Sequence, residues 1–236
     1  MKKAMWIISW GSLVGTAIVL AFMPDSVPMH YDAAGNINRW GSKFENLIMP
    51  VLILIISLFW ALLIRHYEKK AANTKNEKES AEAASNAKFL AIVGVCMAAM
   101  HTIEQGFILY GSYQEALMGA TKWTIDIGKV CNILCGVMFI VLGNYMPKTK
   151  TNATAGVRIS WSMYNDNTWR KSNRFGGYAF IVTGIISIIE SVLVSNSFVA
   201  SMIMVGLLIL ATIVIVIYAH RVFIQETKVE GVRKSQ

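Results

Sequence analysis

Charged side chains are scarce in this sequence. The chain has 236 residues, of which 15% are Asp, Glu, Lys or Arg and 55% are hydrophobic. Soluble domains usually carry about 25% charged residues. The shortfall points away from a soluble domain, and the arrangement of the apolar residues settles the class of protein.

Cysteines are also rare, and the familiar catalytic motifs are missing. Cys96, Cys131 and Cys135 all fall within apolar stretches, and an odd number in such places argues against a disulfide-stapled fold. The chain has no His-Glu-x-x-His zinc motif, no serine nucleophile elbow and no phosphate-binding loop. We therefore expect no enzyme activity, no cofactor and no catalytic or metal-binding residues.

Long apolar runs are abundant. Each run approaches the roughly 20 residues that a helix needs to cross a bilayer. The first run follows Lys2 and Lys3, as a signal peptide would, but no small-x-small cleavage site precedes Met23, so we expect an uncleaved helix. The predicted fold class is an all-α, polytopic integral membrane protein with six transmembrane helices, at about 4–23, 46–65, 87–110, 124–146, 175–195 and 199–223.

Basic residues are distributed unevenly between the predicted loops. Lys and Arg gather at the N-terminus, in the second and fourth loops and in the C-terminal tail, whereas the other loops hold only Arg39, Lys43 and Lys122. Cytoplasmic loops collect Lys and Arg. The pattern predicts an N-in/C-in topology. Orientation and attraction to membrane lipid account for the net charge of +8, so no direct binding to nucleic acid is expected.

The apolar runs and loops divide the chain into parts. A mixed-charge stretch rich in Ala, Lys and Glu separates the first two spans from the other four, and its composition suits a solvated linker or a helical extension. The predicted parts are a two-helix domain at 1–66 with an outward-facing loop at 24–45, a charged cytoplasmic linker at 67–86, a four-helix domain at 87–223 with a cytoplasmic loop at 147–174, and a cytoplasmic tail at 224–236.

Two loops carry motifs that resemble a known family. The outward-facing loop resembles a small membrane domain of no assigned function, through Pro24, Pro28, His30, Gly35, Trp40 and Lys43. The 147–174 loop resembles the hallmark of SdpI-type immunity proteins, through Gly156, Arg158, Trp161, Trp169, Arg170 and Arg174. Relatives often carry His just before the last Arg, where this chain has Asn173, so a role that needs an imidazole there is in doubt.

The resemblance implies a location and a function. Members of this family lie in the bacterial cytoplasmic (plasma) membrane and protect the cell against a peptide toxin. They are also implicated in signalling, in which the membrane protein captures a cytoplasmic transcriptional repressor. The resemblance therefore implies a multi-pass membrane protein whose partners are membrane lipid, an extracellular peptide toxin and a cytoplasmic repressor protein.

Residue chemistry allows two interpretations of each loop. Pro24 and Pro28 stiffen the outward-facing loop, and the segment from Asp32 to Asn36 suits a turn, so the loop is either a preorganised binding surface or a rigid connector. In the other loop, Asn165 or Asp166 suits a helix cap. Its Trp and Arg side chains, with Trp161 and Trp169 among them, suit anchoring in the headgroup layer or docking of a soluble protein.

Five ionisable residues fall within the predicted spans, where charge is costly. The predicted topology puts all of them in the outer halves of their helices, which suggests one polar cluster. Local pairing and reach toward the interface would explain them equally, and a transporter or proton-coupled carrier is the alternative function. A metal site built on His101, Glu104 and a further ligand is a weaker alternative. These residues are His101, Glu104, Asp126, Lys129 and Glu190.

Overall fold

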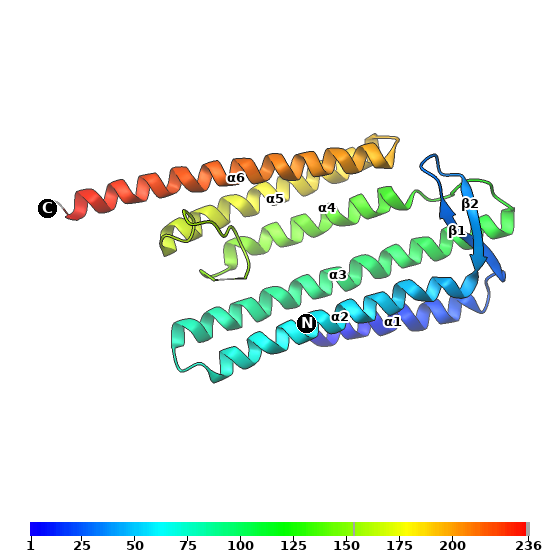
Figure 1. Cartoon of the computed structure of the whole chain (residues 1–236), viewed down its shortest axis with the longest axis horizontal. Helices are drawn as coiled ribbons and strands as arrows, with labels where there is room; N and C mark the ends of the chain where they lie inside the picture. Colours follow the sequence, from blue (N-terminus) through cyan, green and yellow to red (C-terminus); the bar gives the residue numbers. More distant parts are fainter. Residues whose placement is uncertain (153, 235–236) are drawn as a thin grey trace. The chain divides into compact units, whose positions relative to one another are not determined.

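The computed structural model describes residues 1–152 and 154–234, with side chains described up to Glu230. Residue 153 of the predicted 147–174 loop and residues 235–236 of the predicted tail lie outside this range. Six helices are long and apolar enough to cross a membrane, which confirms the predicted class of multi-pass membrane protein. They are α1 (Lys2–Leu20), α2 (Ile48–Asn73), α3 (Glu77–Met118), α4 (Ile127–Tyr145), α5 (Asp166–Leu193) and α6 (Ser197–Lys234) (Figure 1).

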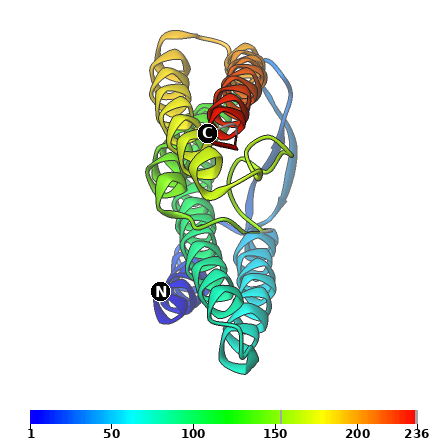
Figure 2. The same cartoon turned by 90° about the vertical axis from the view of Figure 1, so that its left-hand side faces the viewer.

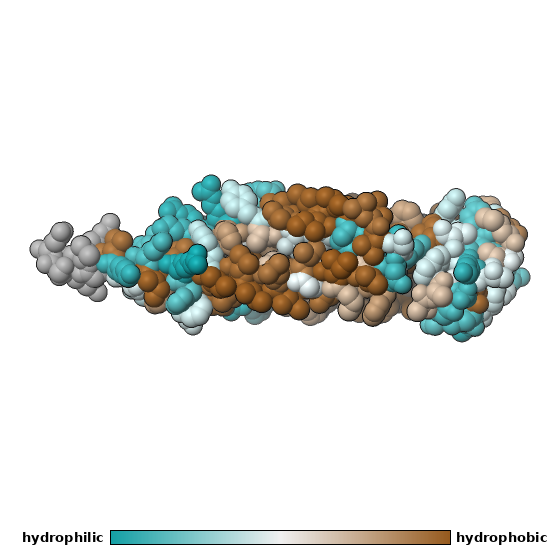
Figure 3. All heavy atoms as spheres, turned by 90° about the horizontal axis from the view of Figure 1, so that it is seen from above, coloured by the Kyte–Doolittle hydropathy of each residue, from teal (hydrophilic) through white to brown (hydrophobic). Residues whose placement is uncertain are grey.

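Large apolar side chains lie on the outer faces of these helices. Ile7 is 72% exposed, Phe59 55% and Leu210 58%. Figure 3 shows hydrophobic atoms over most of the helical face in view and hydrophilic atoms toward the ends of the helices. Lipid tails can cover such side chains favourably, whereas water cannot.

Contacts divide the chain into two units, which are described separately. The first unit comprises Met1–Leu63, Ala91–Cys131 and Asn196–Phe198. The second comprises Ile64–Leu90, Asn132–Ser195 and Val199–Gln236.

A β-hairpin joins α1 to α2 in the first unit. Strands β1 (Ser26–Tyr31) and β2 (Ile37–Ser42) pair antiparallel with an irregular register. A short 3₁₀ helix, η1 (Lys43–Leu47), follows, and Ser42 and Glu45 close a capping box at its start. The turn predicted within Asp32–Asn36 is present, but the strands were not predicted, because Pro28 and Gly41 are typical strand breakers.

The hairpin covers a small apolar core. Leu20, Met23, Val27 and Leu109 form a buried cluster beneath it. Gln105 of α3 is 2% exposed, and its side-chain amide donates to the backbone oxygen of Asn46 at 3.0 Å. Apolar contacts thus attach the hairpin to the helices, and a buried hydrogen bond attaches the η1 helix that follows it to α3.

The charged stretch predicted at 67–86 is mostly helical. Helix α2 continues to Asn73, and α3 begins at Glu77 after Asn76, whose side chain accepts from the backbone N–H of Lys78 at 2.9 Å. At 1.5 Å per residue, the 42 residues of α3 measure about 63 Å, roughly twice the thickness of the hydrocarbon core of a bilayer. Part of α3 therefore extends beyond the apolar region.

Glycines hold α4 and α5 together in the second unit. A methyl group added at Gly136 would meet the backbone oxygen of Gly184, and one added at Gly184 would meet that of Gly136. Gly143 and Gly177 form the same reciprocal pair two turns further along the helices. Small residues at such positions let helix backbones approach closely in lipid. Gly11 and Gly15 of α1 form the small-xxx-small pattern that often marks helix packing in membranes. A methyl group added at either position would meet nothing within 4 Å.

We expect Gly184→Ala to destabilise the protein by about 1–3 kcal/mol, because the added methyl group forces two packed backbones apart. Thermal unfolding of the purified chain in detergent measures the effect. Gly206→Ala is the matched control, since nothing lies within 4 Å of that position. Equal melting temperatures for the two variants would contradict the close packing of α4 on α5.

Candidate functional site

One candidate site is the hairpin platform, which we define as residues 22–47 together with residues 115–126. Lys43 closes its base. The Lys43 ammonium lies 3.0 Å from a carboxylate oxygen of Asp25 and donates to the backbone oxygen of Met23 at 3.1 Å. The Lys43 backbone N–H also donates to the backbone oxygen of Asp25 at 3.1 Å. One lysine thereby fixes where the chain leaves α1 and where it enters η1.

Asp32 organises the tip of the hairpin. Its carboxylate accepts from the backbone N–H groups of Ala34 at 2.9 Å and Asn36 at 2.8 Å, and from the Asn36 side chain at 2.8 Å. These hydrogen bonds, with that of the Asn36 side chain foremost, lower the pKa of Asp32. Gly35 has a φ of +82°, a region that favours glycine.

The hairpin is attached to the segment that joins α3 to α4. The backbone N–H of Ile37 donates to Thr121 at 2.8 Å, and the N–H of Trp123 donates to Gly35 at 2.9 Å. The Trp123 indole lies where a side chain at position 35 would stand. A glycine is therefore required at position 35 both for its backbone conformation and for this ring.

Glu115 of α3 is the buried centre of the platform. It is 1% exposed, and its carboxylate accepts from the Tyr31 hydroxyl at 2.6 Å and from the Thr124 backbone N–H at 2.6 Å. Burial of the Tyr31 ring, and then this hydrogen bond, raise the pKa of Tyr31 well above its usual value. Tyr31 therefore remains a neutral donor at physiological pH.

No sequence motif marks Glu115, Tyr31 or Trp123 as site residues. Glu115 stands near the C-terminal end of α3, before Gly119, whose φ is +59°. A lone acidic residue before a helix-ending glycine is common in sequences, so no local signal marked it. Only the three-dimensional contact with Tyr31, 84 residues away in the sequence, reveals its role.

The outer surface of the platform presents an aromatic and polar face. Trp40 is 43% exposed on β2. His30 Nδ1 lies 2.6 Å from the Asn38 side-chain oxygen, and Arg39 donates to Glu45 at 2.9 Å. Pro28 is fully buried and Pro24 is half-buried, so the prolines shape the platform from within. Such a face can bind a peptide by stacking and hydrogen bonding without first having to become ordered.

A second candidate site is the tryptophan–arginine segment, residues 147–174. Helix α5 begins at Asp166, so Trp169, Arg170 and Arg174 lie on this helix and not in a loop. Asn165 caps the helix, as the sequence predicted, by accepting from the N–H groups of residues 167 and 168. Figure 2 shows α5 beside α6, with the non-helical part of the segment near the start of α5.

Trp169 does not lie at a surface, which corrects the expectation that it anchors in headgroups or docks a partner. It is 2% exposed, and its indole N–H donates to the backbone oxygen of Thr149 at 3.0 Å. The ring is buried because the chain after α4 folds back over it. Trp161 is half-buried, and its ring centroid lies 4.4 Å from that of His220 on α6.

Asn173 holds the segment in place. It is 1% exposed; its side-chain oxygen accepts from the Val157 N–H at 2.8 Å, and its side-chain amide donates to the Trp169 backbone at 3.0 Å. Gly156 has a φ of +115° and packs directly against the Asn173 oxygen. An amide meets both demands, one as acceptor and one as donor, so the departure from the family pattern at this position is structurally consistent.

Acidic residues of α6 secure the far edge of the segment. Glu230 accepts from the Tyr164 hydroxyl at 2.7 Å and from the Asn165 amide at 3.1 Å. The hydrogen bond to Glu230 raises the pKa of Tyr164. Glu226 accepts from Asn167 at 2.5 Å. The basic side chains of the segment remain at the surface: Arg158, Arg170, Lys171 and Arg174 are exposed.

The five ionisable residues predicted within the spans fall in both units of the chain. His101 and Glu104 form a pair on α3, with Nδ1 and Oε2 3.1 Å apart. Asp126 precedes α4, and its carboxylate accepts from the backbone N–H of Lys129 at 3.2 Å. Glu190 lies in the second unit, with both carboxylate oxygens buried and no hydrogen-bond partner for them among the described residues. No group of three metal-ligating side chains occurs in the described part of the chain.

We expect Glu115→Ala to loosen the hairpin platform by a few kcal/mol, because the Tyr31 hydroxyl and the Thr124 N–H each lose their acceptor, at about 1–3 kcal/mol each. Amide hydrogen exchange at Ile37 and Trp123 reports the loosening. Glu79→Ala removes an exposed acidic residue from the same helix and serves as the control. Unchanged exchange in Glu115→Ala would show that the carboxylate does not hold the platform.

The lowered pKa of Asp32 makes the hairpin tip sensitive to acid. Its stabilisation is fully present above the unfolded pKa of about 3.9 and is lost as the pH falls through the lower folded value. Amide protection factors at Ala34 and Asn36 should fall as the pH is lowered below about 3.9. This dependence on pH should be absent in Asp32→Asn. The Thr154 N–H, held at 2.7 Å by the uncharged Asn152 side chain, provides an internal reference that should not respond.

Comparison with known proteins matches the two candidate sites to two families. Residues 7–54 match the domain of unknown function DUF1648, and residues 148–219 match the SdpI/YfhL protein family. The chain is 22% identical over 200 residues to "Immunity protein SdpI" of Bacillus subtilis (strain 168), covering 84% of this chain and 85% of that protein. No solved structure matches the chain. These matches confirm the resemblance inferred from the motifs: one part of the chain is similar to DUF1648 and another part is similar to the SdpI/YfhL protein family.

Proposed function

We propose that the protein is an immunity protein of a bacterial cytoplasmic membrane that gives resistance to an extracellular peptide toxin. The similarity to an immunity protein over most of both chains supports this role. The observation that carries it is the hairpin platform, an ordered, exposed surface at the end of the first two membrane-spanning helices.

The proposal includes the N-in/C-in orientation. Arg39, Lys43 and Lys122 are the only basic residues of the platform, whereas the tryptophan–arginine segment and its surroundings are rich in Lys and Arg. Cytoplasmic segments collect such residues. In this orientation the platform faces outward and the segment faces the cytoplasm.

The platform suits peptide binding because its shape is fixed before any partner arrives. Lys43 closes the base, Asp32 orders the tip, and Glu115 holds the centre. A preorganised surface loses little conformational entropy on binding. The exposed Trp40 ring offers the type of side chain that dominates binding energy at interfaces.

The tryptophan–arginine segment is the part of the protein that suits a cytoplasmic repressor. With Trp169 buried, the available groups are exposed cations, of which Arg158 and Arg174 are examples. Arginine pairs bidentately with carboxylates. We infer that a captured repressor would present an acidic surface to this segment.

Cells that express the protein should survive a membrane-active peptide toxin that kills control cells. The measurement is the fraction of cells that survive each peptide in a panel of such toxins. Trp40→Ala should reduce protection at least about tenfold, the loss expected of an aromatic hot spot at an interface. Trp10→Ala, which removes a more exposed ring from α1 (54% against 43% for Trp40), should protect as the parent does.

Orientation is checked in the same cells with a membrane-impermeant thiol reagent and a cysteine-free parent. A cysteine at Ala33 should react in intact cells, and one at Ser160 only after permeabilisation. Labelling of both on the same side would overturn the proposed topology. Equal killing with and without the protein across the panel would contradict the immunity function.

The buried, unpartnered carboxylate of Glu190 favours one alternative, a small proton-coupled carrier. Failure of protection, combined with proton flux in proteoliposomes that disappears in Glu190→Gln, would support the carrier in place of immunity.

A further inference from the structure

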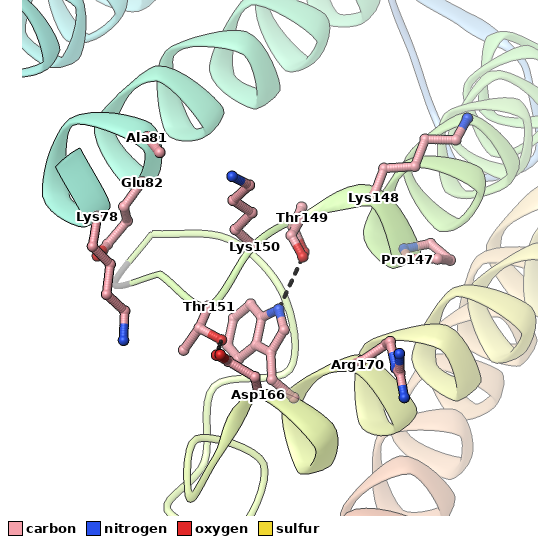
Figure 4. A pocket seen from close by; sticks show the side chains of 11 residues that line it. Lys78, Ala81, Glu82, Pro147, Lys148, Thr149, Lys150, Thr151, Asp166 and Arg170 are labelled. Carbon is pink, nitrogen blue, oxygen red and sulfur yellow. Dashed lines mark hydrogen bonds between the residues drawn. The ribbon is translucent and has the colours of Figure 1, made fainter.

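A cavity of about 610 Å³ opens within the second unit, at the start of α5. Three elements surround it: the first turns of α3, the chain that follows α4, and the first turns of α5 (Figure 4). The volume lies within the range of small-ligand pockets, about 300–1,000 Å³. The buried Trp169 ring lines it, held by its hydrogen bond to Thr149.

Positive charge predominates around the cavity. Four cationic and two acidic side chains line it. Within the described part of the chain, none of the four cations forms an ion pair. Of the two acidic groups, Asp166 already accepts from the Thr151 hydroxyl at 2.9 Å. The cations are Lys78, Lys148, Lys150 and Arg170.

The neutral donors around the cavity are already used. The Thr149 hydroxyl donates to Met146 at 2.7 Å, and the Trp169 indole donates to Thr149. Asn165 and Asn76 cap the first N–H groups of α5 and α3. Lys148 turns its ammonium toward the Tyr145 ring, 5.4 Å from its centroid. The donors that remain for a ligand belong to Lys78, Lys150 and Arg170, one from each surrounding element. Arg170 keeps further N–H groups besides the one that donates to the Asn167 side chain at 3.2 Å.

The cavity lies where membrane-spanning segments end. Lys148 is the last residue of one span and Asp166 the first of the next. The ends of membrane-spanning helices are expected near the lipid headgroups, where basic pockets between helices bind anionic lipids. Lys and Arg bind phosphate through charge-assisted hydrogen bonds.

We propose that this cavity binds a phosphate ester, as the headgroup of an anionic phospholipid. The assignment is independent of the immunity function, because it concerns the second unit and needs no toxin. A bound headgroup would neutralise the cations around the buried Trp169 and hold the tryptophan–arginine segment at the membrane surface.

The test uses the full chain, purified in a nonionic detergent and titrated with phosphatidylglycerol, with retained lipid counted by native mass spectrometry. The double variant Lys150→Gln/Arg170→Gln should weaken binding of the first lipid at least about tenfold. This is the loss expected when two cations that attract an anionic headgroup are removed. The matched control is Arg65→Gln/Lys69→Gln, which removes one exposed Arg and one exposed Lys from α2.

A third variant keeps the test independent of misfolding. Asp166→Asn removes a negative charge from the cavity wall, so it should tighten binding severalfold, and a misfolded protein would not gain affinity. Equal weakening in the two double variants would show general attraction to basic surface charge and would overturn the proposal.

Further titrations identify the source of the phosphate. Phosphatidylglycerol should bind more tightly than zwitterionic phosphatidylcholine and should not be displaced by inorganic phosphate. Displacement by millimolar inorganic phosphate would overturn the lipid assignment and indicate a soluble phosphate ligand. Displacement by poly-glutamate, but by neither phosphate nor lipid, would reject a phosphate site and indicate an acidic protein partner.

Discussion

The hydrocarbon core of a bilayer offers no hydrogen bonds to the polypeptide backbone. Every N–H and C=O group in that region must therefore be paired within the protein, and a helix is the element that pairs its own. This constraint explains why the spans are helical and carry apolar side chains on their outer faces. It also explains why the described backbone that is neither helix nor strand lies between the spans, where water and side chains can pair with its polar groups.

In each of the two candidate sites, a buried polar side chain on a helix pairs with polar groups of the irregular chain. In the hairpin platform, Glu115 accepts from a tyrosine of the hairpin and from the backbone of the segment that follows α3. In the tryptophan–arginine segment, Asn173 accepts from one stretch of backbone and donates to another. Both residues extend from a long helix, so the irregular chain is held by a regular support. A buried group with several partners gives a single well-defined arrangement, because losing any partner is costly.

The two sites differ in what they leave exposed. The platform presents an aromatic ring and pairs much of its charge internally, as the Arg39–Glu45 and Lys43–Asp25 pairs show. The tryptophan–arginine segment buries its central ring, and among the described residues its cations form no ion pairs, apart from Lys171, which lies 3.8 Å from Glu226. The first surface suits a partner recognised by shape, and the second suits an anionic partner or an anionic membrane surface. The two surfaces therefore offer different chemistry to a partner.

The sequence by itself determined the number of spans, the membrane class, the family resemblance and the Asn165 cap, because hydropathy, loop motifs and capping are local properties. It also located the turn at Gly35. The tertiary structure alone decided that Trp169 is buried, that Glu115 joins the hairpin to α3, and that close helix packing occurs at Gly136 and Gly184 and not at Gly11 and Gly15. Those outcomes depend on contacts between residues that are far apart in the sequence, and residue type and local spacing do not specify such contacts.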